Sequence, residues 1–154
     1  MAVKRSEAIV IGHYPLGETD KIVVFFTKDY GKIRAVAKGV RRLKSKLCGR
    51  VEMLTHGDLI FFERVSKDLH SVNSFDIIET FQKLREDLLK IAYCSYMAEL
   101  IQRVTSDGEP DLEIFELMLN TMSVIEKSDA PEIFVRVFEI KLLEKLGLKD
   151  RKSV

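Results

Sequence analysis

The first half of the chain contains five short apolar runs separated by turn segments. The runs cover residues 7–14, 21–27, 33–38, 58–65 and 70–78 and are rich in β-branched and aromatic side chains. Such runs predict β-strands, and the first three are expected to form a meander. Because a longer connection precedes the fourth run, the pattern predicts a small, partly open Greek-key barrel of the OB type. An SH3-like barrel is the main structural alternative.

After residue 79 the apolar residues recur at intervals of three and four instead of two. This spacing predicts one long helix, or two helices end to end, over residues 80–105. Pro110 suits the first turn of a following helix that runs to about Lys127. We expect the buried face of that helix to carry Leu112, Phe115, Leu119 and Met122.

A third helix is predicted from its end signals. Asp129 and Glu132 have the spacing of a capping box, and Gly147 stands where a left-handed C-terminal cap is expected. The whole pattern therefore predicts an α+β protein with two domains, an OB-type barrel over residues 1–78 and a small α-helical bundle over residues 79–154.

The charges are divided unequally between these two parts. The 25 Lys and Arg nearly balance the 24 Asp and Glu over 154 residues, but residues 1–78 hold 14 cations against 9 anions, so the helical part is acidic. No apolar run is long enough for a signal peptide or a membrane span. Two cysteines 46 positions apart support neither a disulfide framework nor a zinc site. We expect a protein of the reducing cytoplasm without membrane contact.

The basic charge is concentrated in residues 31–50, which contain no carboxylate. This clustering is typical of a site for a polyanion, with a solvated loop as the alternative. Ile33, Ala35 and Ala37 alternate with Lys32, Arg34, Val36 and Lys38, an imperfect period of two that predicts a half-buried strand, which leads into the cationic residues and holds them in register. The predicted nucleic-acid-binding residues are Lys32, Arg34, Lys38, Arg41, Arg42, Lys44, Lys46 and Arg50.

Patterns that would indicate an enzyme are weak. Residues 12–19 nearly match a phosphate-binding loop, but Glu18 occupies the position of the essential lysine, so no nucleotide cofactor is expected. The three histidines are dispersed and offer no metal-ligand spacing. Acidic residues 107–113 could form a nuclease metal site, although carboxylates also gather at helix N-termini. We expect no catalytic and no metal-binding residues.

The two cysteines and the paired phenylalanines have structural explanations. Cys94 lies among apolar helical neighbours and is expected in the core, and Cys48 is expected to be inert. In each Phe-Phe pair one ring should face the barrel interior and the other the exterior. An exterior ring beside basic residues could stack on unpaired bases, but the sequence does not indicate which ring does so.

Four segments resemble the bacterial recombination mediator family RecO. They are GETDKIVVFFT (17–27), GKIRAVAKGVRRLKSKL (31–47), YMAEL (96–100) and FVRVFEIKLLEKLGL (134–148). Each is loose alone, but their order and spacing together are specific. The family has an N-terminal OB domain and a helical domain, in agreement with the change of periodicity near residue 79.

This resemblance implies function and partners. Family members are not enzymes; they bind single- and double-stranded DNA, anneal strands, and with RecR help to load RecA onto DNA coated by the single-strand-binding protein. The acidic tail of that protein docks on the helical domain, where Arg136 matches a basic position. Members typically continue into a four-cysteine zinc module that this sequence lacks, so a truncated or a divergent short form is expected. The alternative function is a protein-interaction adaptor whose barrel does not bind nucleic acid.

Overall fold

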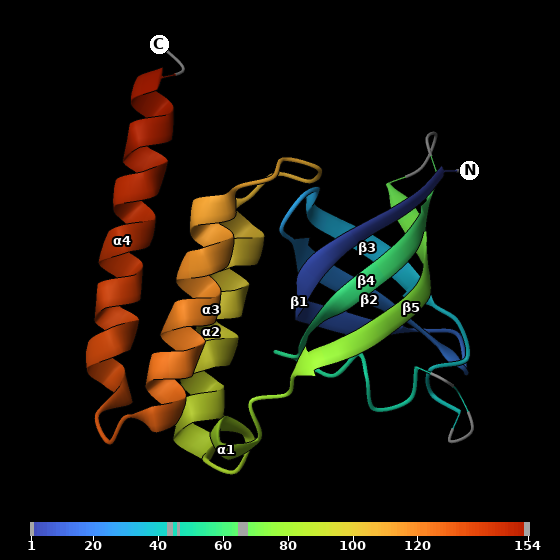
Figure 1. The fold of residues 1–154 in the computed structure, drawn as a ribbon, viewed down its shortest axis with the longest axis horizontal. Helices are drawn as coiled ribbons and strands as arrows, with labels where there is room; N and C mark the ends of the chain where they lie inside the picture. The colour runs from blue at the N-terminus through green and yellow to red at the C-terminus, as the bar shows by residue number, and fades with distance from the viewer. Residues whose placement is uncertain (1, 43–44, 46, 65–67, 153–154) are drawn as a thin grey trace.

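The computed structural model describes residues 2–42, 45, 47–64 and 68–152. The described residues form five strands followed by four helices (Figure 1). The strands are β1 (Ala2–Leu16), β2 (Asp20–Thr27), β3 (Gly31–Ala37), β4 (His56–Glu63) and β5 (Leu69–Glu79). The helices are α1 (Gln82–Arg85), α2 (Leu88–Val104), α3 (Leu112–Lys127) and α4 (Pro131–Lys152). The predicted α+β class is therefore confirmed.

The strands close into a barrel in the order β1-β2-β3-β5-β4. All neighbouring strands are antiparallel except β3 and β5, which pair in parallel over Arg34–Val36 and Leu69–Ser71. A five-stranded Greek-key barrel of this kind is the OB architecture. The OB-type prediction is confirmed, with the difference that the barrel is closed where a partly open one was expected.

The first strand is longer at its start than the apolar run predicted. It begins at Ala2, because the residues before Glu7 also pair with β4, from Ala2 opposite Glu63 to Ser6 opposite Leu59. Arg5 and Asp58 form a salt bridge across the two strands. A bulge between Val10 and Gly12 lets the second half of β1 turn onto β2. Strand β4 ends at Glu63, and the predicted end at Val65 lies outside the described residues.

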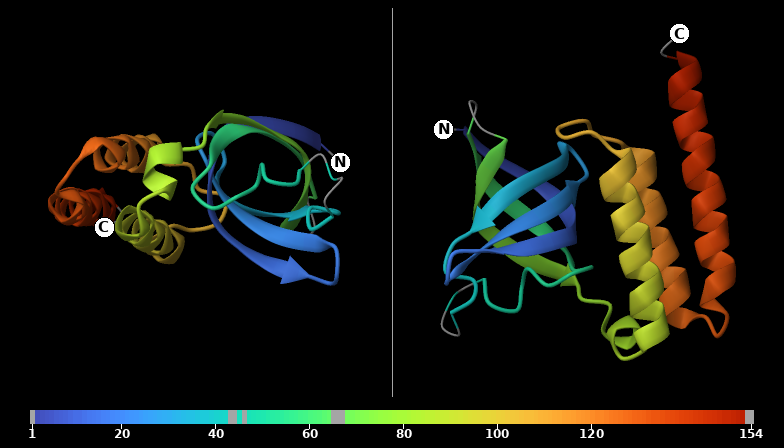
Figure 2. Two further views of the ribbon diagram at one scale, coloured as in Figure 1. Left: turned by 90° about the horizontal axis from the view of Figure 1, so that it is seen from below. Right: turned by 180° about the vertical axis from the view of Figure 1, so that it is seen from behind.

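The helices cover one side of the barrel, and α4 forms the outermost layer (Figure 2). Two apolar cores result. Phe25 lies inside the barrel against Phe75, with ring centroids 5.3 Å apart, whereas Phe26 points outward and packs on Phe115 of α3 at 6.2 Å. The two rings of the pair do point in opposite directions, as predicted. The outward ring is nevertheless buried, because the helices cover that part of the barrel surface.

Helix boundaries follow local capping. Residues 80–105 form two helices, and Asp87 caps α2 by accepting hydrogen bonds from the amides of Leu89 and Lys90. Helix α3 begins at Leu112 with Asp111 as its cap, so Pro110 precedes the helix instead of lying in its first turn.

Two predictions about the helices were wrong. Leu112 is 48% exposed instead of buried, because the buried face of α3 runs through Ile114 and Phe115 and Leu112 lies outside it. Helix α4 continues beyond Gly147 to Lys152. Gly147 does not have a positive φ, whereas a glycine that caps the end of a helix adopts the left-handed conformation.

A buried lysine joins the barrel to the helices. Lys32 of β3 is 6% exposed, and its ammonium donates hydrogen bonds of 2.7 Å to the carbonyl oxygens of Gln102 and Thr105 at the end of α2. Its own carbonyl accepts a hydrogen bond of 2.9 Å from the Gly108 amide, so the α2–α3 loop extends the edge of β3. Gly31 is required beside it, because a side chain there would overlap the backbone of Glu109.

We predict that Lys32→Met lowers the free energy of unfolding by about 1.5 to 3 kcal/mol. The carbonyl oxygens of Gln102 and Thr105 lose their charged donor in a site that water does not readily enter. Urea denaturation measures this change. Lys28→Met is the matched control, because Lys28 pairs with Glu7 at 3.3 Å in an exposed position and should contribute at most about 1 kcal/mol. Equal losses in the two variants would contradict a structural role for Lys32.

Candidate nucleic-acid interface

Strand β3 carries the start of the basic segment into the barrel wall. Ile33, Ala35 and Ala37 are buried in the barrel interior, whereas Arg34 and Val36 point outward. The predicted half-buried strand is confirmed. It ends at Ala37, and Gly39 with φ of +66° turns the chain toward the β1–β2 turn.

The turn that follows β3 is clamped onto the turn between β1 and β2. The Gly39 amide donates to the Asp20 carboxylate at 2.8 Å, and the Arg41 amide donates to the Thr19 carbonyl at 3.0 Å. The Arg41 guanidinium also donates to the Gly17 carbonyl at 2.8 Å. The backbone of this turn and the Arg41 guanidinium are thus fixed, and cations on a fixed backbone bind a polyanion at a lower entropic cost than cations on a mobile one.

The clamp depends on an ionised carboxylate. The hydrogen bond from the Gly39 amide lowers the pKa of Asp20, the hydroxyl of Thr19 lowers it further, and the charges of Lys38 and Arg42 act in the same direction. The ionised form therefore stabilises the turn above the ordinary aspartate pKa. This contribution is lost as the pH falls through the lowered value in the folded protein.

The structure separates the eight predicted residues into groups. Lys38, Arg41, Arg42 and Arg50 are exposed. Lys44 and Lys46 lie outside the described residues. Lys32 is buried on the carbonyls of α2 and cannot reach a phosphate in this arrangement, because the register of β3 points it at the helices.

Two of the arginines already have carboxylate partners. Arg34 pairs with Asp107 of the α2–α3 loop at 2.6 Å, and Arg50 pairs with Asp76 of β5 at 3.2 Å. A phosphate would have to compete with these acids. Among the predicted residues that the structure describes, Lys38, Arg41 and Arg42 are consequently the exposed cations that no described carboxylate pairs with.

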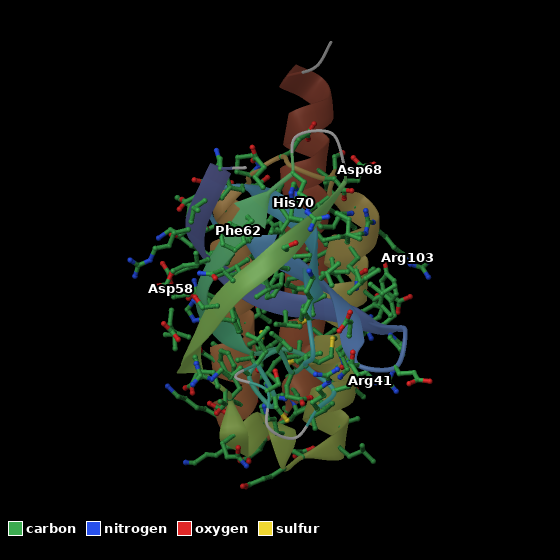
Figure 3. The ribbon with its side chains drawn as sticks, turned by 90° about the vertical axis from the view of Figure 1, so that its right-hand side faces the viewer. Arg41, Asp58, Phe62, Asp68, His70 and Arg103 are labelled. Atoms are coloured by element: carbon green, nitrogen blue, oxygen red, sulfur yellow. The ribbon has the colours of Figure 1, made fainter. Side chains whose placement is uncertain are left out.

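Sequence reasoning missed one arginine on the same side of the molecule. Arg103 lies in the last turn of α2, its side chain is 73% exposed, and Figure 3 shows it on the side where Arg41 lies. It pairs with Glu99 one helical turn earlier, at 2.8 Å. The sequence identifies a helix-end arginine here, but only the packing of α2 on the barrel places it on the same side of the molecule as Arg41.

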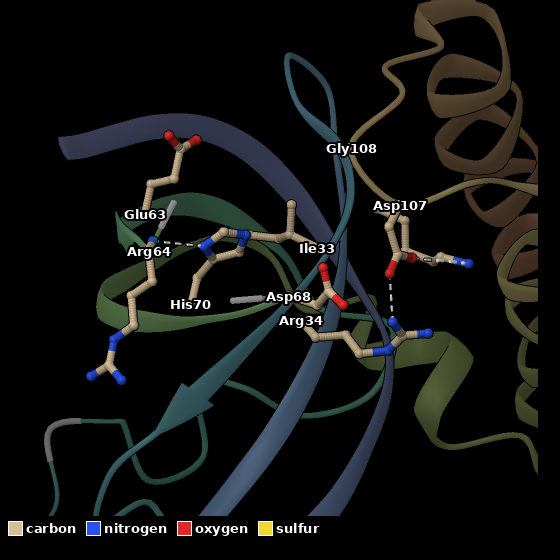
Figure 4. A pocket seen from close by; sticks show the side chains of 9 residues that line it. Ile33, Arg34, Glu63, Arg64, Asp68, His70, Asp107 and Gly108 are labelled. Atoms are coloured by element: carbon tan, nitrogen blue, oxygen red, sulfur yellow. Dashed lines mark hydrogen bonds and ion pairs between the residues drawn. The ribbon is translucent and has the colours of Figure 1, made fainter. Parts of the chain in front are cut away.

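A pocket of about 290 Å³ opens where β3, β5 and the α2–α3 loop meet (Figure 4). Its lining mixes both signs of charge. Asp107 is paired with Arg34, and the ring nitrogen Nδ1 of His70 accepts the Arg64 amide at 3.1 Å. Figure 4 shows the Arg64 guanidinium directed away from His70, so the pocket does not gather positive charge.

The acidic residues 107–113 do not converge on one point. Asp107 faces Arg34, Asp111 caps α3 by accepting from the Ile114 amide, and Glu113 pairs with Lys145 at 2.8 Å. Within the part of the chain that the structure describes, no three His, Cys, Asp or Glu side chains are grouped to hold a metal ion.

The cysteines differ sharply in environment. Cys94 is buried in the core between barrel and helices, as predicted, and this burial raises the pKa of its thiol to about 12, with the charge of Glu126 as a smaller cause. Cys48 is exposed in the basic segment.

Arg136 is exposed on α4 and makes an ion pair with Glu139 three residues later, at 2.5 Å. The hydroxyl of Tyr96 donates to the same carboxylate, which links α4 to α2. Of the two phenylalanines near Arg136, Phe138 is fully buried and Phe134 is half-buried, so only Phe134 could contribute to a surface site.

The described helices include no segment with the length and hydropathy of a membrane span.

Comparison with known proteins gives a consistent family. A model described as "Recombination protein O N terminal" matches residues 1–81, and one described as "Recombination protein O C terminal" matches residues 85–149. A protein named DNA repair protein RecO from Alkaliphilus metalliredigens is 38% identical over 146 residues, 94% of this chain and 58% of that relative. A namesake from Acetivibrio thermocellus is 38% identical over 144 residues, 93% of this chain and 57% of that relative. The chain thus spans less than two thirds of these relatives.

Proposed function

Because the chain belongs to the RecO family, we propose that it is a DNA-binding accessory protein of DNA repair and recombination that contacts phosphates through its basic turn. The observation that carries the proposal is the clamped turn of Lys38, Arg41 and Arg42, which are exposed, have no carboxylate within their own segment and are held by backbone hydrogen bonds to the β1–β2 turn. Such cations contact phosphates, which are the same for every base, and therefore confer no sequence specificity.

The finer activities rest on the family resemblance. We propose that the protein binds single- and double-stranded DNA, anneals complementary strands, and acts with RecR on DNA coated by the single-strand-binding protein to favour RecA loading. None of these activities needs bond-making by the protein, and we propose a non-catalytic role without a cofactor. We also propose that it works in the cytoplasm at the nucleoid.

An adaptor that binds proteins instead of nucleic acid is the second candidate. Helix α4 is apolar on two opposite faces: Val135, Phe138 and Leu142 are buried, while the outer face leaves Ile133 57% and Ile140 57% exposed. An exposed apolar stripe is typical of protein contacts. Fluorescence anisotropy with labelled single- and double-stranded oligonucleotides separates the two candidates, because the adaptor would bind neither.

We predict that DNA affinity depends strongly on salt and weakly on sequence. With Lys32 buried and both Arg34 and Arg50 paired with carboxylates, five cations of the segment remain, and log K for a single strand should fall against log salt with a slope of roughly −3.5. Anisotropy titrations at several salt concentrations give this slope. Measurable affinity with a slope near zero would be incompatible with phosphate contacts.

We predict that the double variant Arg41→Glu, Arg42→Glu binds DNA more weakly and reduces the steepness of the salt slope by about 1.4, because two phosphate contacts are lost. The fold should persist, since both side chains are exposed. The control is Lys127→Glu, Lys141→Glu, which makes the same change in net charge on exposed positions of α3 and α4. Equal weakening by the two variants would show that only net charge matters.

The helical part generates a separate prediction for the tail of the single-strand-binding protein. An acidic, phenylalanine-ended peptide should bind near Arg136, with its carboxylate replacing Glu139 as the partner of the guanidinium. We expect Arg136→Ala to weaken binding of the peptide and Lys141→Ala, five residues later, to leave that binding unchanged. Isothermal titration calorimetry measures both. Undiminished binding by Arg136→Ala removes this residue from the site, and no binding by the unmodified chain rules out a site within these residues.

A further inference from the structure

We propose that the outer surface of β1, β2 and β3 carries a stacking platform for unpaired nucleic-acid bases, centred on Tyr14. The inference rests on the proposed DNA binding and specifies the ligand that the barrel prefers, a single strand with accessible bases. The platform consists of Tyr14, Ile22 and Val36, one residue from each of three neighbouring strands.

The strand register aligns these three side chains. Tyr14 lies directly opposite Ile22, and Ile22 lies directly opposite Val36. Residues directly opposite each other project from the same face of a sheet, with Cβ atoms about 4.5 to 5.5 Å apart. The three side chains therefore form a continuous apolar row across the sheet.

The alternation along β2 shows which face carries the row. Val23 and Phe25 point into the barrel, whereas Val24 points outward to the helices. Ile22 is two residues from Val24 and so shares its outward face. The helices bury Val24, which is 2% exposed, but the row lies beyond their cover, where Tyr14 is 45% exposed.

The other aromatic rings of the barrel are engaged elsewhere. Phe25, Phe26, Phe61 and Phe75 are buried, and Tyr30 packs edge-on against Phe61 at 5.8 Å. Phe62 of β4 is half-buried, so Tyr14 is the most exposed aromatic ring of the barrel among the described residues, and Leu16 on the same face is 38% exposed beside it. An exposed ring that adjoins apolar side chains offers a surface on which a base can stack.

Cations flank the Val36 end of the row. The outward positions of β3 are Arg34 and Val36, and Lys38 follows directly after the strand, so the apolar residue lies between two positive charges. Arg41 is fixed at the neighbouring turn by its hydrogen bond to Gly17. Two of the nearby acids have partners of their own: Asp20 accepts from the Gly39 amide, and Asp107 pairs with Arg34.

This arrangement favours single strands for a physical reason. Cations can contact the phosphates of either a single strand or a duplex, but a duplex hides the faces of its bases in its own stack. An aromatic platform therefore adds affinity only for unpaired bases. Because every base can stack on it, the platform has little sequence preference.

The experiment compares three labelled ligands of equal length, oligo-dT, an abasic strand with the same phosphates, and a duplex. Tyr14→Ala should lower the affinity for oligo-dT about fivefold or more, the effect of losing one stacked base. The affinities for the abasic strand and the duplex should change by less than about twofold. Tyr14→Phe should retain the affinity for oligo-dT, because its ring stacks equally well. Tyr96→Ala, which removes the exposed tyrosine of α2, is the control and should change none of the three.

A second readout tests contact directly. The chain contains no tryptophan, so Tyr14→Trp introduces a single indole whose fluorescence oligo-dT should quench, whereas the abasic strand should not. Equal weakening of all three ligands by Tyr14→Ala, or an unquenched indole in a protein that binds oligo-dT, overturns the platform and leaves the proposed function standing. If the unmodified chain binds none of the three ligands, both proposals are wrong.

Discussion

The ammonium of Lys32 on the last carbonyls of α2 is the contact on which the arrangement of this molecule depends. A buried lysine is tolerated only when acceptors surround it, and the negative end of a helix supplies them. The same residue pairs its backbone with the α2–α3 loop, which brings Asp107 to Arg34. Strand β3 and helix α2 are thereby held in one register, and the outward face of the barrel is covered at one end and open at the other.

A second polar contact organises the open end. Asp20 and Thr19 tie the turn after β3 to the turn between β1 and β2, and the cations that follow β3 take their positions from that tie. The clamp places a carboxylate close to the basic residues. Because its oxygens accept hydrogen bonds from Gly39 and Thr19, this carboxylate serves to orient the cations and only partly offsets their field.

The helical part presents a different kind of surface. Helix α4 buries one apolar face against α2 and α3 and leaves the opposite face exposed, while the acidic character of this part disfavours contact with a phosphate backbone. The two parts thus divide the chemistry between them. We propose that phosphate and base contacts fall to the barrel, and apolar or peptide contacts to the helices.

The sequence by itself determined the element types, the alternation that buries Ile33, Ala35 and Ala37, and the change from strands to helices near residue 79, because these depend on local periodicity. It identified a basic segment but not the fate of each cation. Whether Lys32 meets a phosphate or the end of a helix, and whether an outward ring such as Phe26 or Tyr14 stays accessible, depends on which side of the barrel the helices cover. That choice is made by contacts between residues about 70 or more positions apart, such as Lys32 with Gln102 and Ile11 with Gln102, and no local pattern encodes them.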